Sequence, residues 1–271
     1  MNMPFRPLEV APTMLRWLSS TWWVLLLKNP HIYLSKLLKD TLMMGVLLSI
    51  LYVIMRLLEF DGNHFSAPIH TIIGLVIGLL LVFRTNSAYE RWWDARKLFA
   101  SLHGSMMTFK VIAHRNDPLL NAMTEVNRSI FRMLNTDDQP SSLTVQKSLM
   151  KAMIDVDSLT DPSIRTEVRR VLSDISDKAS HLERIKDTPI PLSYTFHIKI
   201  SVFAYLLSLP FGVFFNLGVW SIPMVMILFF IIAGIEIISN EIENPFRNDP
   251  NDLPIGEYEA ANNALLTASE E

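Results

Sequence analysis

The chain has 271 residues, of which 50% are hydrophobic and 19% charged, and its mean hydropathy is +0.27. It is too apolar for a typical soluble domain and too charged for a chain held wholly in lipid, so we expect a membrane bundle joined to a cytosolic helical layer. The formal net charge of −3 gives no support for a nucleic-acid partner. The absence of cysteine excludes disulfides and thiolate metal sites.

Residues 1–40 are expected to form a cytosolic or interfacial N-terminal segment. Trp17, Trp22 and Trp23 lie near basic residues there, and indole rings favour the membrane–water interface. An amphipathic helix on the membrane surface and a helix packed against the bundle both fit this pattern. The first apolar run is short and is not followed by small residues, so no cleavable signal peptide is expected.

Four apolar segments are expected to cross the membrane as helices. The first two are residues 41–58 and 67–83. Residues 200–235 carry no charge over a length that exceeds one bilayer crossing. They are expected to fold as a hairpin, with spans at 198–217 and 219–236.

The distribution of basic residues predicts the topology. Residues 1–40 and 84–199 contain many lysines and arginines, whereas the connecting segments 59–66 and 216–221 contain none. Because basic residues stay on the cytoplasmic side, both termini are expected to be cytoplasmic.

Residues 84–197 are expected to form a cytosolic helical region. Asp161-Pro162 is typical of an N-cap followed by proline at the first helical position. After it, a heptad seam predicts a helical partner, in the same subunit or in another, and Lys178 interrupts this seam. The apolar members of the seam are Ile164, Val168, Val171, Ile175, Leu182 and Ile185. The C-terminal segment, residues 237–271, is expected to be cytosolic and to end in a short helix and a frayed tail.

Within the second span, Leu75, Leu79 and Phe83 recur every four residues and would form one apolar stripe on a helix. Gly74 and Gly78 lie one step round, spaced as Gly-x-x-x-Gly, which allows neighbouring helices to approach closely. Several copies around an axis would enclose a narrow apolar tube. On spacing alone, an ordinary span facing lipid or its neighbours is the simpler interpretation.

Three motifs at the membrane boundaries resemble, in the same order, motifs of the bestrophin ion-channel family. The first, at the end of the second span, contains Phe83-Arg84, Asn86-Ser-Ala-Tyr89, Arg91-Trp-Trp93 and Arg96. The second is Thr188-Pro-Ile-Pro-Leu-Ser-Tyr194, before the third span. The third consists of Glu241-Ile-Glu-Asn-Pro-Phe246 and Asn251-Asp-Leu-Pro254, after the fourth span. The short, cysteine-free chain is similar to the bacterial branch, which implies the bacterial inner (plasma) membrane.

The resemblance implies an all-α polytopic membrane protein that forms a homopentamer around one axial pore, surrounded by membrane lipids. Leu75, Leu79 and Phe83 match the three apolar rings of the pore's neck. Ile164, near the start of the helix that opens at Asp161-Pro162, is the candidate for the cytosolic aperture. A tube lined by Leu and Phe offers no ligand to replace the water around an ion, so it is expected to gate by wetting and drying.

Basic residues follow the apolar stripe directly. Arg84 would attract anions at the inner mouth if it points to the axis. For Arg91, Arg96 and Lys97 we expect anchoring at the cytoplasmic face, with salt bridges to the nearby carboxylates Glu90 and Asp94 and cation–π contacts to the tryptophans. Anchoring of this kind is also the alternative for Arg84.

The acidic segment after the fourth span is a candidate calcium site by the same resemblance. Eukaryotic bestrophins hold a regulatory calcium in an acidic run that follows Asn-Pro-Phe. Asp249 and Asp252 match the first and last aspartates of that run, whereas Pro250 and Asn251 replace its middle. A solvated acidic turn is the alternative, since calcium takes six to eight oxygen ligands. No other cofactor is expected.

The expected function is a channel for small monovalent ions, and the family resemblance implies an anion (chloride) channel. Bacterial relatives are associated with sodium and other monovalent cations, so a cation-selective channel is the first alternative. A non-conducting membrane scaffold is the second. An enzyme is not expected, because the histidines never fall at metal-ligand spacing and neither a Gly-rich phosphate loop nor a Gly-x-Ser-x-Gly elbow occurs.

Overall fold

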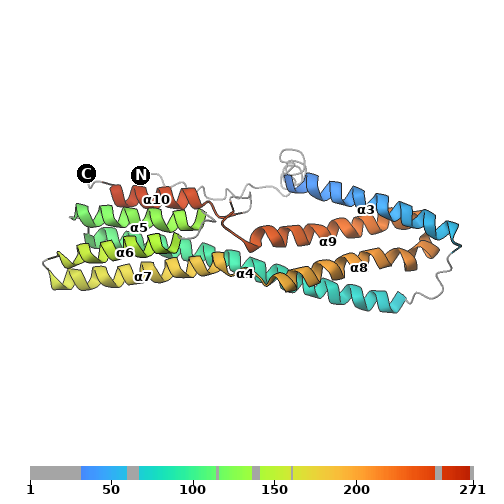
Figure 1. The fold of residues 1–271 in the computed structure, drawn as a ribbon, viewed down its shortest axis with the longest axis horizontal. Coiled ribbons are helices and arrows are strands. Elements are labelled where there is room, and N and C mark those ends of the chain that lie inside the picture. The colour runs from blue at the N-terminus through green and yellow to red at the C-terminus, as the bar shows by residue number, and fades with distance from the viewer. Residues whose placement is uncertain are drawn as a thin grey trace, which may run out of the picture. The chain divides into compact units, whose positions relative to one another are not determined.

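The computed structural model describes residues 32–59, 67–113, 116–135, 141–159, 161–247 and 252–268. Within these ranges every regular element is a helix, which confirms the all-α prediction (Figure 1). Four helical stretches of the described chain are long and apolar enough to cross a membrane, which is the predicted number: Leu34–Leu57, Pro68–Ala113, Pro162–Phe211 and Gly218–Glu243. The predictions for residues 1–31 and for the end of the tail at 269–271 lie outside the described residues.

The chain divides into two compact units, and the first comprises residues 1–67 and 206–234. Its described part contains helix α3 (Ile32–Leu57), the end of α8 (Leu192–Leu217) and most of α9 (Ser221–Glu243). Met44, Leu48 and Val225 form its small apolar core. A Cβ atom at Gly45 would lie 2.6 Å from Met226 Sδ, so α3 and α9 approach each other closely there.

The turn between α8 and α9 depends on one glycine. A short 3₁₀-helix, η2 (Gly218–Trp220), joins the two helices, and Gly218 has a φ of 56°. This left-handed conformation is strained for residues that carry a Cβ atom. The hydroxyl of Ser221 donates a hydrogen bond of 2.5 Å to the Gly218 carbonyl and holds the start of α9. The uncharged segment thus turns within the stretch where the sequence predicts a hairpin.

The second unit comprises residues 68–205 and 235–271 and contains α4 (Ala67–Ala113), an unbroken helix of 47 residues. Residues at alternating intervals of three and four, typical of a heptad seam, bury one face of α4 along most of its length. The apolar members of this face are Ile77, Leu81, Ala88, Ala95, Phe99, Leu102, Met106, Phe109 and Ala113. We call it the buried face of α4.

The far half of α4 packs with α5 (Asp117–Asn135), α6 (Ser141–Asp157), α7 (Pro162–Asp187) and α10 (Ile255–Thr267) around one apolar core (Figure 1). Phe99 of α4 lies at its centre, with its ring centroid 5.7 Å from that of Phe131 and 4.9 Å from that of Tyr258. The buried residues of the α7 seam belong to the same core, so the predicted seam finds its partner within the chain.

Two local predictions for α7 can be compared with the structure. The N-cap is confirmed, since Asp161 Oδ1 accepts a hydrogen bond of 2.8 Å from the Ser163 backbone N–H and Pro162 opens the helix. Lys178, which interrupts the seam, forms an ion pair with Asp174 and donates a hydrogen bond of 2.5 Å to Ser105 of α4. The lysine is therefore tolerated in the seam because its charge is paired.

Helix α10 forms polar contacts with α4 and α5 within the second unit. The prediction of a short helix in the C-terminal segment is confirmed. Asn262 donates a hydrogen bond of 2.9 Å to Asn127 of α5, and its side-chain oxygen lies 2.7 Å from His103 Nδ1 of α4. Lys110 Nζ donates to the carbonyls of Leu266 and Ala268 at 3.2 and 2.9 Å, which satisfies the C-terminal end of α10. These polar ties to α4 and α5 were not anticipated from sequence.

Candidate functional site

The apolar stripe of α4 is exposed. Leu75, Leu79 and Phe83 have exposed fractions of 74%, 53% and 54%, and they lie away from the buried face of the same helix. Large apolar side chains left uncovered in this way need lipid or another protein surface around them. The stripe therefore meets the geometric requirement for lining a tube between several copies, which itself stays a prediction.

The two glycines beside the stripe have different roles. A Cβ atom at Gly74 would lie 3.0 Å from Tyr205 Cζ and closer still to the Tyr205 hydroxyl oxygen, so α4 and α8 are in close contact there. At Gly78 a Cβ atom would meet no described residue within 4 Å, and the glycine is exposed. Among the described residues, only the first glycine of the Gly-x-x-x-Gly pair therefore serves packing within the chain.

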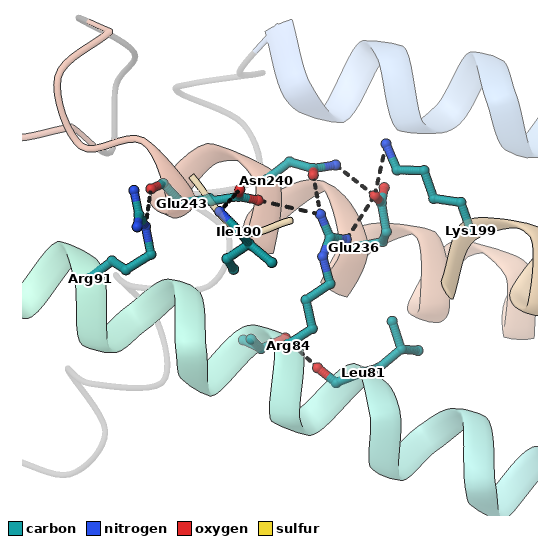
Figure 2. Close-up of polar contacts among 9 residues, drawn as sticks. Leu81, Arg84, Arg91, Ile190, Lys199, Glu236, Asn240 and Glu243 are labelled. Carbon is teal, nitrogen blue, oxygen red and sulfur yellow. Dashed lines mark hydrogen bonds and ion pairs between the residues drawn. The ribbon is translucent and has the colours of Figure 1, made fainter. Parts of the chain in front are cut away.

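Arg84 lies directly after the stripe but belongs to the buried face, with an exposed fraction of 0% (Figure 2). Its Nη1 donates a hydrogen bond of 2.9 Å to Glu236, its Nη2 donates to Asn240, and Glu243 Oε2 lies 3.6 Å from Nη2. Lys199 of α8 lies 3.2 Å from the same oxygen of Glu236. We call these five residues the charged cluster.

The charged cluster explains why an arginine occupies a buried seam position. Arg84 lies three residues after Leu81 and four before Ala88, both of which are buried. A buried cation needs a partner, and the carboxylates of Glu236 and Glu243 provide the opposite charge. In this chain the guanidinium is turned away from the side that bears Phe83, and the prediction that Arg84 charges an inner mouth stays a prediction.

Arg91 joins the ends of two helices, a role that sequence reasoning missed. Its Nη1 and Nη2 donate hydrogen bonds of 2.5 Å to the carbonyls of Thr188 and Ile185 at the end of α7, and its Nε donates at 3.1 Å to the Glu243 carbonyl at the end of α9. A cation is favourable where unpaired carbonyls gather. Glu243 Oε1 in turn accepts a hydrogen bond of 3.1 Å from the Ile190 backbone N–H.

The three motifs at the predicted membrane boundaries therefore meet around Arg84 and Arg91 (Figure 2). The expectation that Arg91 pairs with Glu90 or Asp94 was wrong, because its partners are backbone carbonyls. These partners are distant in sequence and are backbone groups rather than side chains, so no residue pattern predicts them.

The other basic residues after the stripe behave as expected. Lys97 forms a salt bridge of 2.7 Å with Asp94 on the exposed side of α4. The guanidinium carbon of Arg96 lies 5.4 and 5.9 Å from the ring centroids of Trp92 and Trp93, which confirms the cation–π contact.

The other two predicted sites are only partly described. Ile164 lies in the first turn of α7 and is exposed, so it is available to face a pore axis or solvent.

Of the two predicted calcium ligands, Asp249 lies outside the described residues and Asp252 is partly buried. In the described part of the chain no group of three or more His, Cys, Asp or Glu side chains converges as a metal site would require. Because Asp249 is not among the described residues, the calcium site stays a prediction.

Comparison with known proteins identifies the family. The family described as Bacterial/Fungal Bestrophin protein matches residues 15–116 and 115–264. A voltage-dependent anion channel-forming protein of Nostoc sp. is 29% identical over an alignment of 248 residues, and the match covers 78% of each chain. One of the same description from Synechocystis sp. is 30% identical over an alignment of 235 residues, and the match covers 72% of this chain and 75% of the relative.

The fold is also found among solved structures. The crystal structure of a bacterial bestrophin homologue from Klebsiella pneumoniae matches with a TM-score of 0.75 and 19% identity, over 84% of this chain and 97% of that chain. A variant of the same homologue with a single substitution matches with a TM-score of 0.76 and 20% identity, over 86% of this chain and 98% of that chain. With its four apolar helical stretches and the match along most of its length, this chain belongs to the bacterial and fungal branch of the bestrophin family of membrane channels.

Proposed function

We propose that the chain forms an ion channel in which five copies surround one axial pore. The observation that carries the proposal is the exposed apolar stripe of Leu75, Leu79 and Phe83 on one side of α4, with the opposite side buried in the chain's own packing. Copies arranged around an axis would give each stripe a partner and enclose a neck three apolar rings long. The family and the names of its relatives support the same assignment.

In this channel the neck acts as a hydrophobic constriction. Its side chains cannot replace the water around an ion, so the pore conducts when the neck is wet and closes when it dries. Ile164 forms the cytosolic aperture, and both termini face the cytoplasm of a bacterium whose inner membrane holds the channel. A regulatory calcium at Asp249 and Asp252 is not needed for this mechanism.

The permeant ions are small monovalent anions such as chloride, by analogy with the relatives named as anion channel-forming proteins. A second candidate, a channel for monovalent cations, is favoured by a specific observation. Arg84 is held by carboxylates on the buried face of α4, whereas Glu90 and Asp94 are exposed on the other side.

The test is current through the purified full-length protein in a planar lipid bilayer under a tenfold salt gradient. Current with a reversal potential near the chloride Nernst value supports the anion channel, and one near the cation value supports the second candidate. The triple change of Leu75, Leu79 and Phe83 to alanine is expected to raise conductance, because shorter side chains widen the neck and make it easier to wet.

The matched control is Ile227→Ala on α9, which also shortens an exposed apolar side chain in a predicted span but lies outside the stripe. It is expected to leave conductance unchanged. Equal currents from the wild type and the triple variant would remove the neck from the gate. A folded protein that passes no current would instead favour the scaffold.

A further inference from the structure

The uncovered side of α4 does not stop at the neck. From Phe83 it continues through Asn86, Glu90, Trp93 and Lys97, at alternating intervals of three and four residues, and every one of these residues is exposed. On a helix such positions share one face. Glu90 follows Phe83 by seven residues, so it lies two turns, or about 10.5 Å along the axis, beyond the last apolar ring.

The other charged side chains near this end of the neck have partners within the chain. Arg84 lies in the charged cluster, and Arg91 holds the carbonyls at the ends of α7 and α9. Asp94 and Lys97 form a salt bridge in which both side chains are more than half exposed. Each of these groups therefore has a partner of opposite charge or polarity within the chain.

Glu90 differs from its neighbours. It is exposed, and in the described ranges of the chain neither a cation nor a hydrogen-bond donor pairs with it. Its charge is therefore the uncompensated one closest to Phe83 on the uncovered side of α4.

We propose that Glu90 is the residue that discriminates between cations and anions at the cytosolic end of the neck. The inference rests on the proposed channel and supports its second candidate, the channel for monovalent cations: each copy places one Glu90 carboxylate in a ring on the cytosolic side of Phe83. A ring of carboxylates attracts cations and repels anions, and low-dielectric walls strengthen its field. The neck cannot supply this discrimination because its side chains carry no formal charge.

The test compares Glu90→Gln and Glu90→Lys with the wild type, using full-length protein in a planar bilayer under a tenfold KCl gradient. Neutralisation is expected to raise the anion-to-cation permeability ratio by about tenfold, the lower end of what a charge-lined, low-dielectric cleft produces. Charge reversal is expected to raise it further. The matched control is the double variant Asp94→Asn with Lys97→Met, which removes the salt-bridged pair on the same face without changing its net charge, and its effect is expected to be much smaller.

A second measurement needs no variant. At an ionic strength of 1 M the Debye length is about 3 Å, so the wild-type permeability ratio is expected to shift toward that of Glu90→Gln as salt rises on both sides of the bilayer. Unchanged reversal potentials in the Glu90 variants, with currents of normal size, overturn the role of Glu90 and leave the channel standing. Equal shifts from Glu90→Gln and from the double variant of Asp94 and Lys97 overturn it as well. A wild type without current overturns the channel itself, and the role of Glu90 with it.

Discussion

The two sides of α4 carry neighbouring residues into opposite environments. Phe83 is an apolar residue that the chain leaves exposed, and Arg84 is a cation that the chain buries completely. The buried side is determined by contacts within the chain, above all by Glu236 and Asn240. The exposed side is available to face a pore axis, membrane lipid or another copy of the chain. Hydropathy alone would have buried Phe83 and exposed Arg84. Arg84 is buried instead because carboxylates on α9 pair with it there.

The largest expected effect is on the buried side. Replacing Arg84 by methionine leaves Glu236 and Glu243 largely buried without their shared cation, and breaking a buried pair in this way costs about 3–5 kcal/mol of unfolding free energy. Thermal unfolding in detergent, followed by circular dichroism, measures the loss. Methionine keeps the long unbranched side chain, so the loss reports the charge more than the volume.

The control for that experiment is the double variant Arg84→Met with Glu236→Gln. It removes charge from both partners and is expected to recover part of the lost stability. A single Arg84→Met variant as stable as the wild type would show that the charged cluster does not hold α4 and α9 together.

A smaller effect is expected from the two glycines beside the stripe. Gly74→Ala places a methyl group against the Tyr205 hydroxyl, and overpacking of this kind costs about 1–3 kcal/mol. Gly78→Ala adds the same methyl group where nothing lies within 4 Å, and it is expected to gain up to about 1 kcal/mol from helix propensity. The unfolding midpoints of the two variants give the comparison.

Tyr205→Phe added to Gly74→Ala is expected to restore part of the lost stability, because it removes the oxygen atom that the new methyl group meets but leaves the ring carbon Cζ close to it. Equal effects of alanine at the two glycines would mean that α4 and α8 are not in close contact at Gly74.

The smallest effect concerns Asp174 of α7. Hydrogen bonds from Lys178 and, next, from Ser105 hold the pKa of the Asp174 carboxyl below its usual range. A depressed pKa contributes stability that is present above the unfolded pKa of about 3.9 and is lost as the pH falls through the folded value. Asp174→Asn is therefore expected to lower stability slightly at neutral pH.

The same change is expected to flatten the pH dependence of unfolding below about pH 4, since the titrating carboxyl is gone. Glu125→Gln is a suitable control, because its salt bridge with Arg128 is exposed on the surface. An acid limb identical in the wild type and Asp174→Asn would remove Asp174 from the pH dependence.

The sequence predicted the features that local pattern encodes. The apolar spans, the N-cap at Asp161 and the α7 seam all follow from residues close together in the chain, and the family motifs predicted the fold. The buried side of α4 could not be chosen by hydropathy alone, because Ile77 and Leu81 are as apolar as Leu75 and Leu79. Ile77, Leu81, Ala88 and Ala95 follow one another at intervals of four, seven and seven residues, and this heptad-like spacing was a usable signal that was overlooked.

The polar contacts depended on residues far away in sequence. Arg84 meets Glu236 across 152 positions, and Arg91 donates to backbone carbonyls that any residue could provide. The ties of α10 depend similarly on Asn127 and Asn262, which are separated by 135 positions. Such pairs become visible only when the helices are placed in space.

The unbroken length of α4 has a mechanical consequence. From Phe83 to Ala113 the helix runs for 30 residues, or about 45 Å, without a bend-promoting proline. It behaves as a stiff rod whose far end is embedded in the packed side chains around Phe99. A tilt of about 2° around Phe83 moves that far end by about 1.5 Å, which a close-packed interior does not absorb without repacking. The width at Phe83 and the side-chain arrangement around Phe99 are thus expected to change together.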